Sequence, residues 1–237
     1  MQLTQIKKLT GALVLKTGLH IGAGDTEMRI GGTDNPVAKN PLDGQPYIPG
    51  SSLKGKIRSL LEWQFGVLMA TDGHPYSFKH YKAAPAEQGK QLLQLFGGAP
   101  DKDCEDLVKN IGPTRLAFWD CALNADWLKK VQARNILSVE VKSENTIDRI
   151  RGVAEHPRFT ERVIAGAEFD FRLSLKVIDG EDLLPMLLQG LKLLEADSLG
   201  GSGSRGYGKV ALTKLALDGD ESIQARYAAI QPFATAA

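Results

Sequence analysis

The segment Ala167–Asp179 alternates apolar and polar residues more regularly than any other part of the chain. Alternation with a period of two is typical of a strand that buries one face and exposes the other. We therefore expect a sheet with one covered face, and helices that cover it. The apolar positions of the expected strand are Phe169, Phe171, Leu173, Leu175 and Val177.

Other segments predict further strands and two long helices around this strand. The apolar residues Leu53, Ile57 and Leu61 recur at helical spacing, and Ser51 or Ser52 can cap the helix that they predict. In chain order we expect a strand over 5–16, a helix over 51–65, strands over 114–123 and from 137, the strand above, a helix over 180–196 and a strand over 209–217.

This order is β-α-β-β-α-β, the ferredoxin-like (RRM-like) arrangement of the α+β class. We expect one domain over residues 1–237, interrupted by insertions at about 66–110 and 143–165. Connections of that length are usually functional or disordered. The first insertion is expected to be irregular over 66–88 and to hold a short helix over 89–96, as a helical block or lid.

The chain carries 29 basic and 28 acidic residues, a net charge of +1. A protein that binds polyanions through its overall charge is usually far more basic. Any such binding must therefore depend on local charge, and Lys54, Lys56 and Arg58 lie together with no acid between Ser51 and Leu61.

No apolar run is long enough to span a membrane, and the N-terminal segment alternates like a strand rather than a signal peptide. We expect no membrane partner and a cytoplasmic location. Cys104 and Cys121 are then expected to be reduced thiols.

The segment Pro49–Arg58 predicts an anion site. A helix N-terminus presents unpaired N–H groups and the positive end of the helix dipole. The candidate ligands of a phosphate are Gly50, Ser51, Ser52, Lys54, Lys56 and Arg58. An ordinary capped helix with a solvated basic face is the alternative.

The glycine-rich segment Leu199–Lys209 is a second candidate for phosphate binding. Its GxGxxG match follows a helix and precedes a strand, which is the reverse of a dinucleotide site. Successive backbone N–H groups can still form a phosphate nest, with Arg205 as the charge and Tyr207 as a stacking face. Gly203 and Ser204 complete the candidates, and a flexible linker is the alternative.

Asp34 lies in the segment Ile30–Val37, and its ordinary interpretation is a turn aspartate. Asp25 and Asp43 are loop acids of the same kind. A zinc site from His74, His80 and Cys104 matches no standard spacing, so a metal site there is disfavoured.

Five segments, taken together and in this order, resemble the RAMP superfamily, and within it the Csm-type backbone subunits of type III-A CRISPR complexes. They span about half of the chain, and Ala165 stands where that family usually has proline. The matching segments are 17–25, 30–41, 46–62, 139–171 and 199–210.

The resemblance implies a subunit that binds guide RNA and stacks with further copies of itself in a filament. It also implies the other type III-A subunits as partners, namely the large, small, guide-end-binding and terminal subunits. Residues 143–165 would form a β-hairpin thumb that wedges into the guide–target duplex at regular intervals. The slicing aspartate of the family maps onto Asp34, and Asn40 stands where relatives often carry a second acid.

One carboxylate fits the implied reaction, cleavage of complementary target RNA. RNA carries its own nucleophile, the 2′-hydroxyl, once the backbone is distorted into line with the phosphorus. Asp34 would bind a divalent metal ion, with magnesium expected, or help to deprotonate that hydroxyl. DNA lacks the hydroxyl and would not be cut.

Two alternatives stay open. The chain could be a scaffold that holds guide RNA without cutting, with Asp34 as a turn residue. It could also be a guide-maturation endonuclease that uses His20 as a general base, although His20 is otherwise a candidate RNA contact. The thumb-like insertion argues against the second alternative, because a hairpin-cutting enzyme has no duplex to space.

Overall fold

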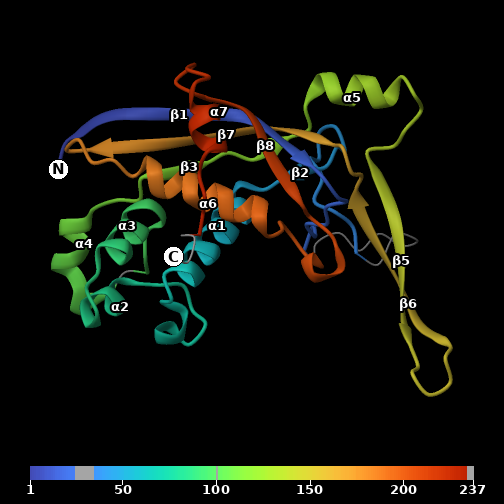
Figure 1. The fold of residues 1–237 in the computed structure, drawn as a ribbon, viewed down its shortest axis with the longest axis horizontal. Helices are drawn as coiled ribbons and strands as arrows, with labels where there is room; N and C mark the ends of the chain where they lie inside the picture. Colours follow the sequence, from blue (N-terminus) through green and yellow to red (C-terminus); the bar gives the residue numbers. More distant parts are fainter. Residues whose placement is uncertain (25–34, 100, 234–237) are drawn as a thin grey trace.

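A computed structural model describes residues 1–24, 35–99 and 101–233. Its main sheet has four strands in the order β3-β7-β1-β8 (Figure 1). The two central strands pair antiparallel along almost their whole length, from Leu3 opposite Ile178 to Val14 opposite Glu168. The strands are β1 (Leu3–Leu15), β3 (Leu116–Phe118), β7 (Glu168–Ile178) and β8 (Val210–Leu217).

Two helices, α1 (Gly50–Gln64) and α6 (Leu184–Ala196), pack on one face of this sheet (Figure 1). Of the apolar stripe expected for α1, Leu53, Ile57 and Leu61 are fully buried, whereas Leu60 and Phe65 are partly buried. The stripe meets α6 at Gly190. A Cβ atom at Gly190 would lie 2.7 Å from Ile57 Cγ2 and 2.9 Å from Leu61 Cδ1. The two helices can therefore approach this closely only because residue 190 is glycine.

The mixed α+β fold with an antiparallel sheet is confirmed, and so is the strand expected over 167–179. The strand expected over 114–123 is wrong as one element. Its second part is β4 (Cys121–Ala122), which pairs with β2 (Tyr47–Ile48) in a separate sheet. Between β3 and β4, Asp120 accepts a hydrogen bond from the amide of Gly50 at the start of α1 (2.7 Å), and Leu123 again bridges to β7 at Phe169.

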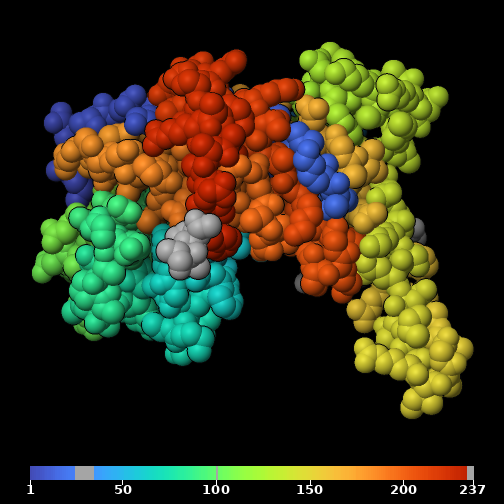
Figure 2. All heavy atoms as spheres, in the orientation of Figure 1, coloured from blue at the N-terminus to red at the C-terminus, as the bar shows by residue number. Residues whose placement is uncertain are grey.

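A β-hairpin projects from the body of the molecule (Figures 1 and 2). It consists of β5 (Val139–Ile147) and β6 (Ala154–Val163), paired antiparallel, and follows α5 (Ala125–Gln132), which the sequence did not predict. Within the two strands only Glu161 and Val163 are buried, and both lie at the root. Since a lone two-stranded hairpin is marginally stable in water, its root contacts hold it in place.

The segment expected to be a helical insertion, here called the helical insertion, lies at the opposite end of the molecule (Figure 1). It has a small core of its own around Tyr76, Phe78 and Leu93. The prediction that 66–88 is irregular is wrong, because Ser77 and His80 form a capping box that starts a helix there. The elements are η1 (Leu68–Thr71), α2 (Phe78–Ala83), α3 (Glu87–Phe96), η2 (Lys102–Cys104) and α4 (Glu105–Ile111).

The chain ends with the short helix α7 (Ile223–Ala228), whose residues Ile223 and Tyr227 are buried. Within the described ranges, no helix combines the length and apolar character needed to cross a membrane.

Candidate functional site

Two stems, residues 18–23 (the first stem) and 35–39 (the second stem), lead into and out of the segment that contains Asp34. The amide of Ala38 donates to the carbonyl of Ile21 (2.9 Å), and the amide of Ala23 donates to the carbonyl of Pro36 (3.2 Å). Asp34 itself lies outside the described residues, as does Asp25. The structure therefore places the two ends of the loop, and Asn35, the neighbour of Asp34 in the chain, begins the second stem.

Both stems contact the root of the hairpin. Leu19 and Val163 exchange two backbone hydrogen bonds of 3.0 and 2.8 Å. The amide of Glu161 donates to the carbonyl of Asn35 (3.1 Å), and His20 Nδ1 lies 2.7 Å from the carbonyl oxygen of Glu161. His20, a predicted RNA contact, is thus half-buried against strand β6.

The glycine-rich segment packs against the first stem. The amide of Gly208 donates to the carbonyl of Gly18, and the amide of Gly201 donates to the carbonyl of His20, both at 2.9 Å. The segment includes a 3-10 turn, η3 (Gly203–Arg205). A Cβ atom at Gly203 would lie only 2.0 Å from Ser198 Oγ, so a larger residue there must displace its neighbours. The segment is a packed loop rather than a flexible linker.

Arg205 reaches from this loop to the hairpin. Its Nε lies 3.1 Å from Glu144 Oε2, and its Nη2 donates to Ser202 Oγ (2.6 Å). Burial works to raise the pKa of Glu144, but the hydrogen bond from Lys142 and the charge of Arg205 outweigh burial and hold this pKa below its usual value. Glu144 is therefore ionised at neutral pH.

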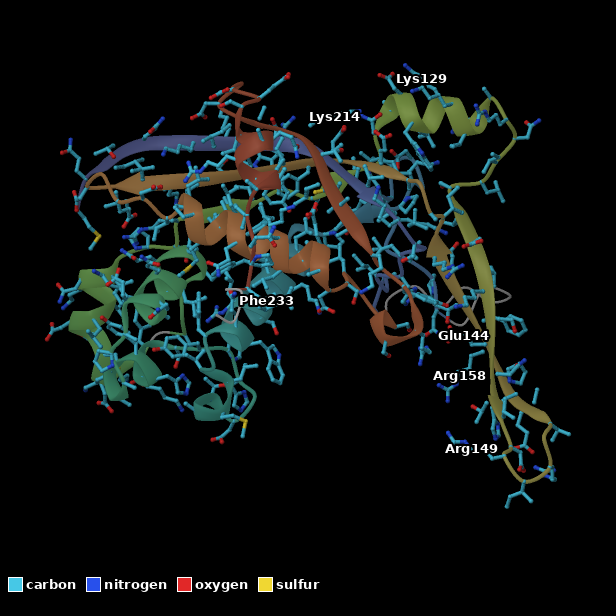
Figure 3. All side chains as sticks on the ribbon, in the orientation of Figure 1. Lys129, Glu144, Arg149, Arg158, Lys214 and Phe233 are labelled. Carbon is cyan, nitrogen blue, oxygen red and sulfur yellow. The ribbon has the colours of Figure 1, made fainter. Side chains whose placement is uncertain are left out.

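An open cleft of about 360 Å³ lies between the hairpin and Arg205. Figure 3 shows Glu144, Arg158 and Arg149 following one another from the root of the hairpin toward its tip. The cleft carries more basic than acidic side chains, which suits a phosphate backbone. Its lining residues are Lys142, Glu144, Asn145, Thr146, His156, Arg158 and Arg205.

The stacking face expected at Tyr207 is contradicted by the structure. Tyr207 has no exposed surface, and its ring is covered by Lys142 Nζ at 4.5 Å and the guanidinium of Arg162 at 4.9 Å from the centroid. These cations come from the two strands of the hairpin, so Tyr207 attaches the glycine-rich loop to the hairpin root. Ser204, by contrast, is exposed.

The start of α1 differs from the prediction. The helix begins at Gly50 with Pro49 as its N-cap, so neither Ser51 nor Ser52 caps it. The amide of Gly50 donates to Asp120 Oδ1 (2.7 Å), so a carboxylate of the chain itself occupies this anion position. Gly50 is also required for packing, since a Cβ atom there would lie 3.0 Å from the carbonyl oxygen of Trp119.

The three basic residues of α1 have different surroundings. Arg58 is largely buried and bonds to the buried carboxylate of Glu62 (2.7 Å) and to the carbonyl of Tyr76. Lys56 pairs with Asp197 (2.6 Å). Lys54 makes no ion pair within the described part of the chain, and burial, with the nearby charge of Arg58, lowers its pKa. Because Arg58 is held by Glu62 and Tyr76, it stabilises the fold, whereas Lys54 remains available to a ligand.

Asp197, the C-cap of α6, joins the start of α1 to the glycine-rich segment. Its carboxylate binds Lys56, and its backbone carbonyl accepts a hydrogen bond from Lys209 Nζ (2.8 Å). Two basic side chains from distant segments thus meet beside the end of the glycine-rich loop. Together they place basic groups between the glycine-rich loop and the start of α1.

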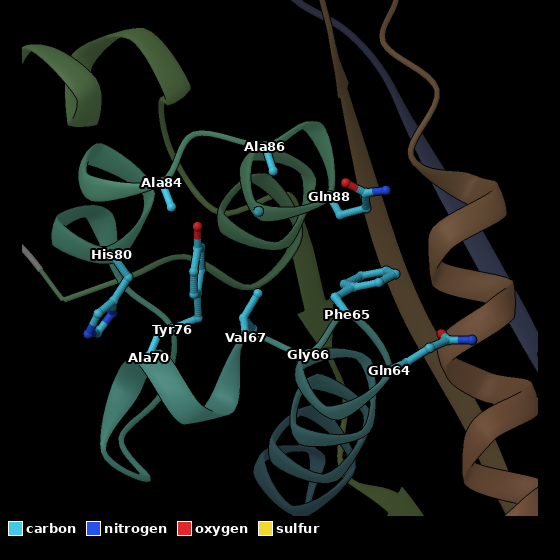
Figure 4. Close-up of a pocket in the computed structure, with 11 residues that line it drawn as sticks. Gln64, Phe65, Gly66, Val67, Ala70, Tyr76, His80, Ala84, Ala86 and Gln88 are labelled. Atoms are coloured by element: carbon cyan, nitrogen blue, oxygen red, sulfur yellow. The ribbon is translucent and has the colours of Figure 1, made fainter.

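A second hollow, of about 520 Å³, lies in the helical insertion between the end of α1 and helices α2 and α3 (Figure 4). Phe65, Val67 and Tyr76 contribute to its apolar lining, and none of the predicted site residues borders it. His80, at its edge, caps α2, and no group of three potential metal ligands occurs among the residues that the structure describes.

Sequence reasoning missed Glu161, Glu144, Lys209 and Asp120. Glu161 carried a usable signal, because it shares a strand face with Val163, and an acid on a buried face needs a partner. Asp120 bonds to Gly50 and Glu144 to Arg205, both far away in the sequence, and no local pattern marks these contacts or the bond of Lys209 to Asp197.

A family model described as the RAMP superfamily matches residues 12–211. The chain therefore belongs to the RAMP superfamily.

Within that superfamily the chain is similar to the Csm3 proteins. It is 42% identical over 214 residues to the CRISPR system Cms endoribonuclease Csm3 of Streptococcus thermophilus, covering 88% of this chain and 87% of the relative. It is 40% identical over 225 residues to the Csm3 endoribonuclease of Mycobacterium tuberculosis, covering 88% and 86%. The resemblance drawn from the motifs is confirmed.

A solved structure has a similar fold, namely the crystal structure of a Csm3–Csm4 subcomplex in the type III-A CRISPR-Cas interference complex. The match has a TM-score of 0.55 and 28% identity, and covers 92% of this chain and 80% of that chain.

Proposed function

We propose that this chain is a backbone subunit of a type III-A CRISPR complex, which holds guide RNA and cleaves the target RNA paired to it. Its Csm3 relatives are named endoribonucleases, and the similar solved structure is a Csm3–Csm4 subcomplex of such a complex. One structural observation carries the proposal. The loop stems bond to the hairpin root through backbone hydrogen bonds, and the glycine-rich segment bonds to the first stem through its backbone and to the hairpin through Arg205 and Tyr207.

The guide RNA would lie along the basic surface between the hairpin and the start of α1. Arg205 is exposed, and its ion pair with Glu144 is of the partly exposed kind that contributes only about 0–1 kcal/mol. Phosphate oxygens can therefore replace the carboxylate. Lys54, Lys56 and Lys209 continue the surface, and we keep His20, Ser51, Ser52, Gly203 and Ser204 as proposed contacts of the RNA backbone. Gly50 is not among them, because its amide already bonds to Asp120.

The hairpin would act as the thumb that interrupts the guide–target duplex. Its tip exposes Ile147, Ile150 and Val153, and Ile150 is 96% exposed. Apolar side chains inserted between base steps unstack them at a cost of about a few kcal/mol per step. Successive copies along one guide would then distort the duplex, and cut the target, at regular intervals. Other subunits of the complex, such as a Csm4-like neighbour, would join the row.

The cleavage step would use the 2′-hydroxyl of the target as nucleophile. Asp34, just before Asn35 at the hairpin root, would accept its proton or hold a divalent ion. A single carboxylate fits magnesium, because that ion is usually bound by one or two carboxylates together with substrate phosphates. Bound there, magnesium would neutralise charge on the scissile phosphate.

We also assign β1, α1, β3, β7, α6 and β8 to a ferredoxin-like core. The order β3-β7-β1-β8, with both helices on one face, supports this assignment. Residues 66–110 and 143–165 would then be insertions into a single domain.

The test is Asp34→Ala in a reconstituted complex with guide RNA and a labelled complementary target. We expect target binding to persist, because many phosphate contacts supply it, and cleavage to fall by roughly a hundredfold or more. Asp43→Ala is the matched control, since Asp43 is an exposed loop acid that caps its own turn at Gln45 N. Wild-type cleavage by the Asp34→Ala complex would show that Asp34 is not the cleaving residue, and would favour a scaffold function for this subunit.

A target with 2′-deoxy nucleotides at the cut positions tests the nucleophile separately. It should bind and remain intact, because the attacking hydroxyl is missing. Cleavage of this target would contradict the proposed reaction while leaving the subunit assignment in place.

A further inference from the structure

The hairpin contains one buried acid. Glu161 is only 7% exposed, on a strand whose other acid, Glu155, lies near the tip and is half-exposed. Burial of a carboxylate is unfavourable unless the charge is paired and hydrogen-bonded. The partners of the Glu161 carboxylate therefore show which segment of the chain the root of the hairpin binds.

The carboxylate binds the stem that follows the loop. Glu161 Oε2 accepts the amide hydrogen of Val37 (2.9 Å), and Oε1 accepts a hydrogen bond from Lys39 Nζ (2.7 Å). The ion pair is mostly shielded, with side-chain exposures of 31% for Lys39 and 10% for Glu161. Charge-assisted hydrogen bonds of this kind are stronger than neutral ones.

The backbone of the same residue binds both stems. The amide of Glu161 donates to the carbonyl of Asn35 (3.1 Å), on the second stem. Its carbonyl oxygen lies 2.7 Å from His20 Nδ1, on the first stem. Glu161 thus fixes the two stems to strand β6. Of the residues that it contacts, Asn35 is the nearest to Asp34 in the chain, because it directly follows Asp34.

We propose that Glu161 is a positioning residue that couples the thumb hairpin to the cleavage loop. This inference rests on the proposed function, in which Asp34 acts on the target. The hairpin sets where the duplex is distorted, and Glu161 sets where the second stem, which leads out of the loop, lies relative to the hairpin. The reacting atoms must approach to about 3–3.5 Å, and a misplacement of about 1 Å can lower the rate about a hundredfold.

The consequence is a specific defect. Without the carboxylate, the second stem keeps its covalent connection but loses the ion pair between Lys39 and β6. Guide and target binding come from phosphate contacts elsewhere and should persist. The cleavage rate should fall, and cuts should spread from one position to neighbouring positions.

The test compares Glu161→Gln, Lys39→Met and the double variant in assembled complexes. Glutamine can still accept the Val37 amide but loses the ion pair, so it is the mildest change. We expect the single-turnover rate at saturating target to fall about tenfold or more, with the half-saturating target concentration unchanged within about twofold. The double variant should be no worse than either single one, because both remove the same pair. Lys39→Arg should restore most of the rate.

Glu168→Gln is the matched control. It removes a glutamate–lysine pair, to Lys214 (3.6 Å), that joins strands β7 and β8 of the main sheet. It should leave rate and cut positions unchanged. Thermal unfolding and guide content of every complex are measured in parallel, which separates positioning from loss of fold.

Asp34→Ala in the same assay separates the two proposals. If Asp34→Ala stops cleavage while Glu161→Gln and Lys39→Met cut at the wild-type rate and positions, the coupling is wrong and the proposed function stands. If the rate falls only in parallel with guide content or melting temperature, Glu161 is structural and the coupling is again wrong. If Asp34→Ala cuts normally, the proposed function itself fails.

Discussion

Glu144 of the hairpin and Arg205 of the glycine-rich loop form an ion pair of 3.1 Å across the mouth of the basic cleft. Arg205 must leave this partner to bind a phosphate. In the proposed function, the pair would compete with an RNA phosphate for the same guanidinium.

This competition predicts opposite effects of two substitutions. Glu144→Gln should raise the affinity for guide RNA by about two- to fivefold, since exposed ion pairs contribute about 0–1 kcal/mol. Arg205→Ala should lower the affinity and reduce the slope of log K against log salt by about one phosphate contact. The measurement is RNA binding as a function of salt, with Lys214→Ala as a surface control outside the cleft. Equal affinity of Glu144→Gln and wild type would show that the pair does not compete.

Arg58 predicts a stability effect rather than a binding effect. Its removal leaves the buried Glu62 carboxylate without its cation, which should lower the free energy of unfolding by about 3 kcal/mol. Urea unfolding of the subunit measures this. Replacing both residues, as Arg58→Met with Glu62→Leu, should recover much of the loss.

Lys54→Ala is the companion variant. It should leave the urea midpoint nearly unchanged and weaken RNA binding, because Lys54 has no ion pair within the described ranges. A large stability loss in Lys54→Ala, or none in Arg58→Ala, would reverse our assignment of the two residues.

The hairpin tip should be removable. Its polar contacts are local, from Asp148 to the amides of Ile150 and Arg151 and from Arg151 to Glu155. Replacing residues 148–153 with Asn-Gly, which favours a two-residue hairpin turn, should leave the melting temperature and guide content unchanged. Regularly spaced cleavage should be lost, as read from the product lengths. A lowered melting temperature would mean that the tip contributes to the fold.

The buried thiol of Cys121 should make the free energy of unfolding depend on pH. Burial raises the pKa of its thiol from 9.0 to about 11. An acid whose pKa is raised by folding favours the folded state below its unfolded pKa, and this contribution is lost as pH rises toward the folded value. Stability should therefore decline between about pH 9 and 11, and less steeply in Cys121→Ala. Equal pH slopes in the two proteins would show that Cys121 is not the titrating group.

The sequence predicts the regular elements best where burial follows a simple period. The strand expected over 167–179 runs from Glu168 to Ile178, because alternate residues face one core. The helix expected over 180–196 starts later, at Leu184, since Asp182 accepts the Leu184 amide and ends the preceding turn. Residues Cys121 and Ala122 pair with Ile48 and Tyr47 of β2 instead of forming one strand with β3, and no local pattern contains this pairing.

The candidate site is predictable in part for the same reason. Arg205 is exposed beside a basic cleft, as expected for a phosphate contact. Tyr207 was expected to be exposed and is not, because Lys142 and Arg162, distant in sequence, cover its ring. The role of Arg58 was likewise hidden, since the carbonyl of Tyr76 that it binds belongs to the helical insertion.

The projecting hairpin is a lever arm whose pivot is the hydrogen-bonded root. Ten residues of β6, at about 3.3 Å each, place the tip about 30 Å from the pivot. A rotation of only about 5° at the root would then swing the tip by a few ångström, close to one base step of a nucleic acid, 3.4 Å. In any row of stacked subunits, the stiffness of that small pivot would decide how faithfully the pitch of the row is kept.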